Sequence, residues 1–516
     1  MRRSHVFTVS IVLLLAAVVL SNPGGVAHAS GPQSGVVEYV AITLTNSQSA
    51  ATPTSFQQQL TIDWSTYSAY LASNVQNVEF FTAQWSPLYA WCESSCSSSA
   101  TSSVVWVNLG SNTIAGSGGT LTIVMGFYST GTNEYSSTGY WGAYPGFTGT
   151  YGQYDNGAKV FDLYFNGNTA TSSFSLGTSA TLAQKTGVTG PSGSAGTINV
   201  LSLIGYGSTN RVDLVFNKAL SNPAAGEIAE SSFEISNSGD TGHNSGAAGF
   251  CDNAAAGSAS NCDSTDVGYG STLESYTYVS GGTATAGVDK VGTDAASTWY
   301  YAATAYPGTS PSAYSGYVAS SLYSSYNTAT SSSPIKSASS LYWSSVGASS
   351  NSYPVGLYFN WGRARAYPPS GVMPSASFAA ASSALAAPVA YSNSGCTTSS
   401  TSFDMGQYVY GGFTVAGSGG TPWSFNVIDQ AGGNVKSVSP ISSSPYCDSA
   451  GYQIPASSSA GTWTIEVLDT NGVNIGQVTF TVNNVQIPDL PSGVLFLLLP
   501  VVALYMLARR RVKVGY

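Results

Sequence analysis

Apolar and polar residues alternate along much of this chain, and this two-residue period constrains its fold more than any other feature. Successive side chains of a β-strand point to opposite faces, so the pattern predicts strands with one buried face. Gly, Asn and Asp separate the runs, and no window of 12 or more residues between the two ends has a 3.6-residue period. We therefore predict an all-β fold. The residues predicted to share a face are Val40, Ile42 and Leu44; Leu121, Ile123, Met125 and Phe127; Val212, Leu214 and Phe216; Val355, Leu357, Phe359 and Trp361; and Trp463, Ile465 and Val467.

The two ends of the chain have the pattern of export and anchoring signals. Residues 1–29 combine two arginines, an apolar run and Ala27-His28-Ala29, which predicts a secretory signal peptide cleaved before Ser30. Residues 490–508 carry no charge and are long enough to cross a bilayer as one transmembrane helix. The basic tail 509–516 would stay in the cytoplasm. We therefore expect a single-pass protein of the cell membrane with its ectodomain outside.

The C-terminal end leaves a second possibility open. The segment Ile487–Gly493, the apolar span and the Arg509–Arg511 cluster resemble the C-terminal sorting tails of archaeal and bacterial surface proteins. In such proteins a sortase-like enzyme removes the tail. Cleavage therefore remains an alternative to permanent anchoring.

Charge excludes one class of function for the expected ectodomain. Six of the 15 Lys and Arg residues lie in the two ends, whereas all 24 Asp and Glu lie in residues 30–489, so that span carries 9 − 24 = −15. Nucleic-acid binding needs basic clusters, so we expect none. Charged residues make up only 8% of the chain against about 25% in ordinary domains. We hypothesise an acidic habitat, where a surface solubilised by charge would change with pH.

The six cysteines fall into three local pairs. Exported proteins keep disulfides, and pairing between nearest neighbours predicts three bridges within single segments. Metal binding by Cys92 and Cys96 is the rival interpretation, but no His or second Cys pair lies near them in the sequence. The predicted bridges are Cys92–Cys96, Cys251–Cys262 and Cys396–Cys447.

Residues 30–165 contain several strand-like motifs that resemble a known family of exported proteins. The motifs are Tyr39–Asn46, Val78–Phe81, Val104–Leu109, Leu121–Phe127 and Tyr151–Phe161. They are similar to the domain called DUF2341, found in archaeal surface proteins, often beside lectin-like sandwiches of the laminin-G/concanavalin type. The resemblance implies a first β-sandwich and no established catalytic residues.

The rest of the ectodomain divides into two further predicted parts. Residues 166–378 resemble the lectin-like jelly roll, with closing strands in Tyr358–Pro374 and long loops between Ser236 and Ser349. Arg363 and Arg365 would share the outer face of that strand. Residues 379–387 read as a small-residue linker, and residues 388–486 have the size and strand spacing of an immunoglobulin-like sandwich next to the membrane.

Catalytic chemistry finds little support in the sequence. After signal cleavage the only histidine is His243, in a loop-like stretch, so a Ser-His-Asp or Cys-His site would depend on it. The string Asp240-Thr241-Gly242 occurs once and no apolar strand leads into it. We therefore predict that the protein is not an enzyme. An extracellular hydrolase using two carboxylates, either a glycosidase or an acid protease, remains the alternative.

Two binding sites are candidates. Asp252, Asp263 and Asp266, with neighbouring asparagines, would offer the oxygen ligands that Ca²⁺ prefers, although such residues also favour turns. We expect no other cofactor. Tyr140, Trp141 and Tyr144 lie in a Gly-rich stretch and could form an aromatic platform for sugar rings, although Tyr also replaces charged residues across the whole surface.

These features together predict a membrane-anchored, extracellular surface protein with a structural or adhesive role. Its expected partners are surface glycans or other envelope proteins, as in proteins associated with a regular surface layer. The anchored hydrolase remains the alternative function.

Overall fold

The computed structural model is all-β, as the alternation predicts. Helical turns are confined in its described part to short segments such as η1 (Trp64–Tyr70) and α2 (Gly157–Val160). The structure describes residues 32–177, 180–206, 211–220, 226–236, 245–254, 261–267, 273–274, 277–280, 283–286, 290–292, 297–307, 314–319, 327–331, 335, 340–347 and 354–484. None of the helices in these ranges is long and apolar enough to span a bilayer. The predicted signal peptide and transmembrane segment lie outside them.

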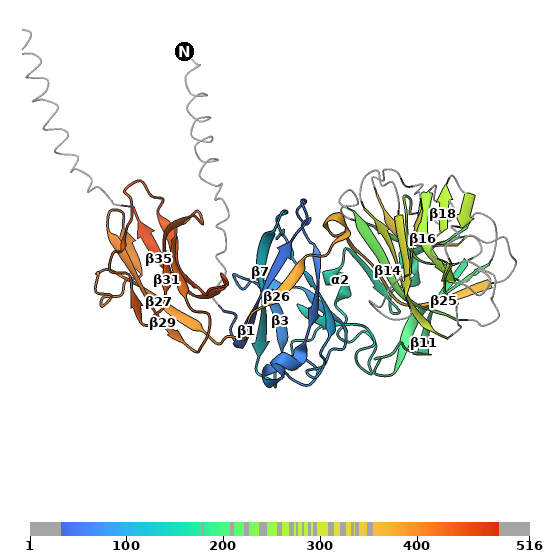
Figure 1. The fold of residues 1–516 in the computed structure, drawn as a ribbon, viewed down its shortest axis with the longest axis horizontal. Coiled ribbons are helices and arrows are strands. Elements are labelled where there is room, and N and C mark those ends of the chain that lie inside the picture. The colour runs from blue at the N-terminus through green and yellow to red at the C-terminus, as the bar shows by residue number, and fades with distance from the viewer. Residues whose placement is uncertain are drawn as a thin grey trace, which may run out of the picture. The chain divides into compact units, whose positions relative to one another are not determined.

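The chain forms two compact units. Among the described residues, the larger contains 32–383 with 471–473, and the smaller contains 384–470 with 474–484. The larger unit holds two β-sandwiches, called here the first and second sandwiches, and the smaller unit holds the C-terminal sandwich (Figure 1).

The first sandwich packs a five-stranded sheet, β26-β1-β7-β3-β4, against a four-stranded sheet, β2-β6-β5-β8. Val40, Ile42 and Leu44 are all fully buried between the sheets, which confirms their predicted face. Its strands are β1 (Val36–Asn46), β2 (Gln57–Ile62), β3 (Val78–Thr82), β4 (Pro87–Leu88), β5 (Ala90–Ser94), β6 (Ser103–Asn108), β7 (Gly119–Tyr128), β8 (Trp141–Ala143) and β26 (Ser375–Phe378).

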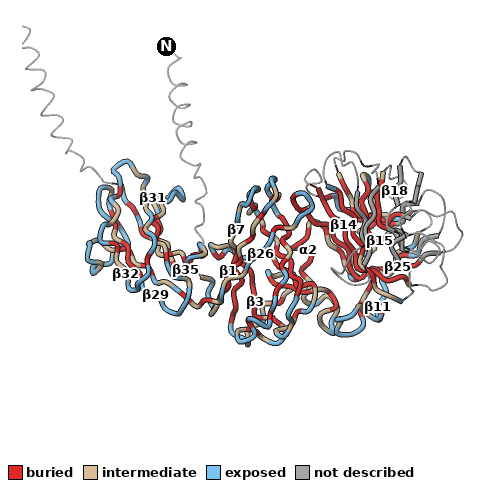
Figure 2. The backbone as a smooth tube through the Cα atoms, in the orientation of Figure 1, coloured by how far each residue is buried: buried red, intermediate tan, exposed pale blue. Residues whose placement is uncertain are grey.

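The second sandwich packs the sheet β10-β13-β24-β15-β16-β18-β19 against the sheet β11-β12-β25-β14-β21-β22-β23, where β9 also pairs with β25. Its apolar core includes buried side chains of β12, β14, β21 and β25 in one sheet and of β13, β15 and β24 in the other; buried residues are red in Figure 2. Its strands are β9 (Leu163–Asn166), β10 (Phe174–Leu176), β11 (Ala180–Thr189), β12 (Thr197–Tyr206), β13 (Arg211–Ala219), β14 (Glu227–Ile235), β15 (Ser245–Cys251), β16 (Asn261–Val267), β18 (Thr277–Ser280), β19 (Thr283–Ala286), β21 (Trp299–Tyr306), β22 (Tyr314–Ala319), β23 (Asn327–Ser331), β24 (Tyr342–Gly347) and β25 (Pro354–Ala366); β17 (Leu273–Glu274) and β20 (Lys290–Gly292) form a separate pair.

One predicted face in this sandwich is wrong. Leu357 and Phe359 are buried in the core, but Trp361 is not part of that core cluster. Ser232 pairs with Trp361 and Phe233 with Phe359, so Asn360 is an extra residue in β25. Such a β-bulge turns every later side chain to the opposite face. Trp361 therefore lies on the outer face of the sheet, together with Arg363 and Arg365, whose shared outer face was predicted correctly.

The chain leaves the first sandwich once and returns to it, which moves the predicted boundaries. β9 begins at Leu163 and belongs to the second sandwich, whereas β26 pairs with β1 of the first. In the predicted linker, Ser382 exchanges backbone hydrogen bonds with Tyr39, and β27 already begins at Leu385. The second sandwich is therefore inserted into the first, and the segment 375–382 completes the first sandwich rather than extending away from it.

The C-terminal sandwich has the two-sheet architecture expected for residues 388–486. Trp463, Ile465 and Val467 are buried, as the alternation predicts. One sheet has the order β27-β29-β32, with β33 also on β29, and the other has the order β28-β35-β34-β30-β31. Its strands are β27 (Leu385–Tyr391), β28 (Ser402–Asp404), β29 (Tyr408–Ala416), β30 (Trp423–Ile428), β31 (Asn434–Ile441), β32 (Tyr446–Cys447), β33 (Tyr452–Gln453), β34 (Gly461–Leu468) and β35 (Asn474–Asn483).

All three predicted disulfides are present. Cys92 is joined to Cys96, Cys251 to Cys262 and Cys396 to Cys447. The first bridge lies beside the contact between the first and second sandwiches, where the candidate site is found.

Candidate functional site

The outer face of the second sandwich is covered by the first, and Arg363 lies at the centre of this contact. Its side chain is 1% exposed. Four aromatic rings surround the guanidinium carbon, with centroids 4.6 to 5.6 Å away. Trp91, Trp106 and Phe161 come from the first sandwich or its exit, and Trp361 comes from β25 itself. A guanidinium over aromatic faces gains cation–π attraction, which strengthens when water is excluded.

Two carboxylates contact different nitrogens of this buried cation. Nη1 of Arg363 lies 3.0 Å from Oε1 of Glu93 in β5, and its Nε lies 2.5 Å from Oε2 of Glu230 in β14. Nη2 of Arg365 donates to the other oxygen of Glu230 at 2.8 Å. Two acids and two bases therefore form one buried network with no net charge.

The partners of the two acids in this network favour their charged forms. Burial alone would raise the pKa of Glu230, but Arg363 and Arg365 outweigh it and lower that pKa to about 2. The carboxylate of Glu93 also accepts a 2.6 Å hydrogen bond from Nε1 of Trp106. Both acids thus have specific partners, which a buried charge needs.

The bulge in β25 places these groups. The carbonyl of Asn360 accepts hydrogen bonds from the hydroxyl of Tyr151 at 2.7 Å and from the amide of Gly167 at 3.1 Å. The extra residue therefore leaves no buried carbonyl unpaired. Because of it, Trp361 and Arg363 face the first sandwich rather than the core.

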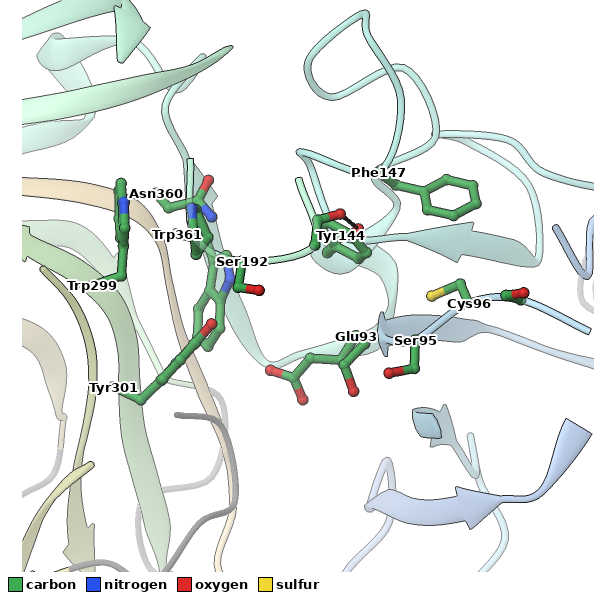
Figure 3. Close-up of a pocket in the computed structure, with 14 residues that line it drawn as sticks. Glu93, Ser95, Cys96, Tyr144, Phe147, Ser192, Trp299, Tyr301, Asn360 and Trp361 are labelled. Atoms are coloured by element: carbon green, nitrogen blue, oxygen red, sulfur yellow. Dashed lines mark hydrogen bonds between the residues drawn. The ribbon is translucent and has the colours of Figure 1, made fainter. Parts of the chain in front are cut away.

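A cleft of about 500 Å³ opens at the edge of this contact. Trp299, Tyr301 and Trp361 line it from the second sandwich, and Tyr144 and Phe147 line it from the first (Figure 3). The remaining lining residues are polar or small, and they are Glu93, Ser94, Ser95, Cys96, Ser97, Pro191, Ser192, Gly193 and Asn360. The cleft therefore combines aromatic faces with hydroxyl groups, an amide and one ion-paired acid.

Strand geometry explains the aromatic wall. Trp299 and Tyr301 lie two residues apart on β21, so their side chains share one face. Ser232 of β14 is in register with both Tyr301 and Trp361. This small side chain lets the two rings approach to 6.1 Å between centroids. Burial, with a smaller contribution from the charge of Glu93, raises the pKa of Tyr301 to about 12.

A hydrogen bond joins the two walls. The hydroxyl of Tyr144 donates to the carbonyl of Gly193, in the turn between β11 and β12, at 2.5 Å. Figure 3 shows this bond as a dashed line at the rim of the cleft. Nε1 of Trp299 donates to the carbonyl of Thr189 at the end of β11. The indole and the turn are thus both fixed in place.

The structure separates the three residues of the predicted aromatic platform. Tyr144 lines the cleft, but Trp141 is fully buried, stacks on Tyr135 and donates to the carbonyl of Val75. Tyr140 is 36% exposed and stacks on Tyr89 outside the cleft lining. The three side chains therefore do not form one surface.

Two of the three predicted calcium ligands have described side chains. Asp252 accepts hydrogen bonds from the backbone and side chain of Asn261, and Asp263 is fully buried. The side chain of Asp266 lies outside the described residues. In the parts of the chain that the structure describes, no three His, Cys, Asp or Glu side chains gather as a metal site. His243 and Asp240–Gly242 lie outside those parts.

Sequence reasoning missed Glu93, Trp299 and Tyr301. Glu93 could have been noticed as a charge inside the apolar strand Ala90–Ser94, since a buried acid needs a partner. The Trp299-Tyr300-Tyr301 triplet lies in a Ser- and Ala-rich region where we expected loops. Nothing in the sequence indicates that these segments meet.

A second buried acid pair lies away from the cleft. Burial raises the pKa of Asp162 to about 6 and that of Glu227 well above its usual range, and each carboxyl further affects the other. Asp162 accepts a hydrogen bond from Nε2 of Gln57, and Oε1 of the same amide accepts one from the backbone of Ala366. The Gln57 side chain therefore hydrogen-bonds to both segments that connect the two sandwiches, at Asp162 and at Ala366. The pair of Asp162 and Glu227 thus belongs to the contact between the sandwiches and not to the cleft.

Comparison with known proteins gives one sequence relative. No protein-family model matches the chain. It is 33% identical over 380 residues to "Uncharacterized protein 562" of Sulfolobus islandicus rod-shaped virus 1. The match covers 69% of this chain and 64% of that protein, so the chain spans less than two thirds of the relative's length.

Solved structures give only distant likenesses. A lectin from Bauhinia forficata in complex with GalNAc is 10% identical, covering 40% of this chain and 98% of the lectin at a TM-score of 0.24. The xylan beta-1,4-xylosidase from Bacillus halodurans is 12% identical, covering 32% of each chain at a TM-score of 0.25. At these TM-scores neither likeness carries a functional argument.

Proposed function

We propose that this protein is an extracellular surface protein that binds carbohydrate in the cleft between its first and second sandwiches. The observation that carries the proposal is the pairing of aromatic faces with neutral polar groups in one cavity of about 500 Å³. Ligand pockets commonly combine apolar and aromatic walls with a few polar groups that fix orientation. A sugar ring matches such a surface, because its C–H face stacks on an aromatic ring while its hydroxyls bond to the rim.

The surface location is supported by other features. Three disulfides suit an oxidising compartment outside the cytoplasm. The export-like N-terminus and the apolar, basic C-terminus fit a membrane-anchored adhesive or structural protein. Cell fractionation, followed by protease treatment of intact cells, tests this part. Protection of the β-sandwiches from added protease would contradict it.

Binding is a better account of the cleft than hydrolysis. Glu93 is the only acidic side chain among the lining residues that the structure describes, and Arg363 and Trp106 engage its carboxylate. A hydrolase of the two-carboxylate type needs a second acid across the cleft and a proton to donate. Release of new reducing ends from an oligosaccharide that the protein binds would instead favour the hydrolase.

Calorimetric titration of the full-length chain against an oligosaccharide library, from pH 2 to pH 7, tests the proposed binding. Trp299→Ala should weaken binding about tenfold, as expected for one lost aromatic contact. Tyr408→Ala is the matched control, because Tyr408 is an exposed aromatic residue of the C-terminal sandwich. If no oligosaccharide binds at any pH in this range, the proposed function is wrong.

A further inference from the structure

The charge and spacing of the groups in the cleft specify what kind of carbohydrate fits. We infer that the cleft takes a neutral oligosaccharide of at least two rings, lying along β21, and rejects uronic-acid and sulfated chains; this rests on the proposed function.

The cleft offers no cation to an anionic ligand. None of the lining residues described in the structure is Lys, Arg or His. The nearest guanidinium groups, those of Arg363 and Arg365, are buried and already divided between Glu93 and Glu230. A carboxylate or sulfate entering the cleft would lose water without gaining an opposite charge, and this costs free energy.

Charge outside the cleft also disfavours anionic chains. The span 30–489 carries a formal charge of −15, so an anionic chain is repelled at long range. The carboxylate of Glu93 reinforces this at short range, because a second anion beside it would compete for Arg363. Neutral hydroxyls meet neither penalty.

The aromatic wall is long enough for more than one ring. Trp299 and Tyr301 are separated by two residues of an extended strand, which is about 7 Å. Trp361 lies beside Tyr301 across the sheet, because both are in register with Ser232, with 6.1 Å between ring centroids. Trp299 and Tyr301 therefore supply two aromatic rings in succession along β21, which suits a ligand of at least two rings.

The rim provides neutral partners along this wall. Ser94, Ser95 and Ser97 border it on the first sandwich, and Ser192 borders it on the second. Hydroxyls both donate and accept, so they match sugar hydroxyls in either orientation. A charged substituent of a sugar would gain only hydrogen bonds from these hydroxyls, with no opposite charge to offset its lost hydration.

Oligosaccharides that differ only in charge or length test the inference on the full-length chain. Neutral β-1,4-glucans of one to six units are compared by calorimetry with uronate and sulfated chains of the same linkage. We expect affinity to rise at least about tenfold from one unit to three, as further rings stack. Uronate and sulfated chains should bind at least about tenfold more weakly at pH 6, and added salt should narrow the difference.

Two variants separate the two parts of the inference. Trp299→Ala should lower the affinity for chains of three units about tenfold and so reduce the gain in affinity from one unit to three, because it removes one ring of the aromatic wall. Ser192→Lys, at an exposed rim position, should raise the affinity for uronate chains relative to that for neutral chains above the ratio measured for Ser192→Gln. Ser192→Gln is the neutral control for side-chain size.

The outcomes distinguish this inference from the proposed function. Equal or tighter binding of uronate or sulfated chains overturns the neutral specificity, and single units binding as tightly as trimers overturn the extended ligand. Both of those results leave carbohydrate binding intact. Absence of binding to every chain, including ligands from a broader library, overturns the proposed function and this inference together.

Discussion

Nη1 of Arg363 lies 3.0 Å from Oε1 of Glu93, so a cation from the second sandwich neutralises an acid from the first. Both side chains are 1% exposed. The two residues are 270 positions apart in the chain. This pair therefore depends on both sandwiches being folded and in contact, and it supports one wall of the cleft.

Replacing Arg363 by Met should destabilise the larger unit by about 3–5 kcal/mol, because Glu93 and Glu230 would lose a shared partner while remaining buried. Urea unfolding followed by tryptophan fluorescence measures this. Lys185→Met, which removes an exposed cation from the same unit, should change stability by less than about 1 kcal/mol. An equally small loss for Arg363→Met would contradict the role given to the network.

Lys should not substitute for Arg at position 363. The guanidinium directs separate nitrogens to Glu93 and Glu230, whereas an ammonium group is a single point charge. We expect Arg363→Lys to recover less than half of the stability lost in Arg363→Met, measured by the same unfolding. Full recovery would mean that charge alone is required.

The larger unit should be most stable under acidic conditions. Burial raises the pKa of Glu79 to about 7 and that of Asp162 to about 6. Their contribution to stability is complete below the unfolded value of about 4 and is lost as pH rises through 6 and 7. Glu230, with its pKa lowered to about 2, acts oppositely and loses its contribution only as pH falls towards 2.

Melting curves between pH 2 and pH 8 should therefore place the highest Tm at about pH 3–5. Glu79→Gln should flatten the decline above pH 5, since the neutral amide can still accept the 2.8 Å hydrogen bond from Tyr128. A maximum at neutral pH would contradict both this prediction and the acidic habitat hypothesised from the low charge content.

Trp141 should behave as a core residue and not as a ligand contact. Trp141→Ala should cost about 3–5 kcal/mol, because the indole is fully buried among Tyr135 and Phe80. Tyr140→Ala, at the partly exposed neighbour, should cost less than about 1.5 kcal/mol. If both variants lost less than about 1.5 kcal/mol of unfolding free energy, Trp141 would not be a core residue, and this would favour the aromatic platform predicted from the sequence.

The disulfide of the C-terminal sandwich should stabilise more than the other two. Cys396 and Cys447 are separated by 51 residues, against 11 for Cys251–Cys262 and 4 for Cys92–Cys96. Loop-closure entropy predicts losses of about 4, 3 and 2 kcal/mol when each pair is replaced by serine. Scanning calorimetry of the three double variants measures these losses of unfolding free energy and hence their order. A larger loss for Cys92–Cys96 would indicate that it contributes through packing beside the cleft.

Local patterns predicted much of the fold. Val40, Ile42 and Leu44 share a buried face because alternation is a property of neighbouring residues in an extended backbone. The three disulfides join nearest neighbours for a similar reason, since short loops close readily. That Arg363 and Arg365 share one face also followed from their two-residue spacing, whereas the bulge at Asn360 decided that this face is the outer one.

Tertiary structure alone decided the candidate site. The bulge at Asn360 turned Trp361 away from the core, and its carbonyl is held by Tyr151 from a distant segment. The cleft gathers residues from positions 93–97, 144 and 147, 191–193, 299 and 301, and 360–361. Strand periodicity determines which face a side chain takes, but not which sheet covers that face. That choice depends on how whole sheets bury their apolar and charged surfaces together, which is why the sequence predicted strands and disulfides but did not predict the contact of Arg363 with Glu93.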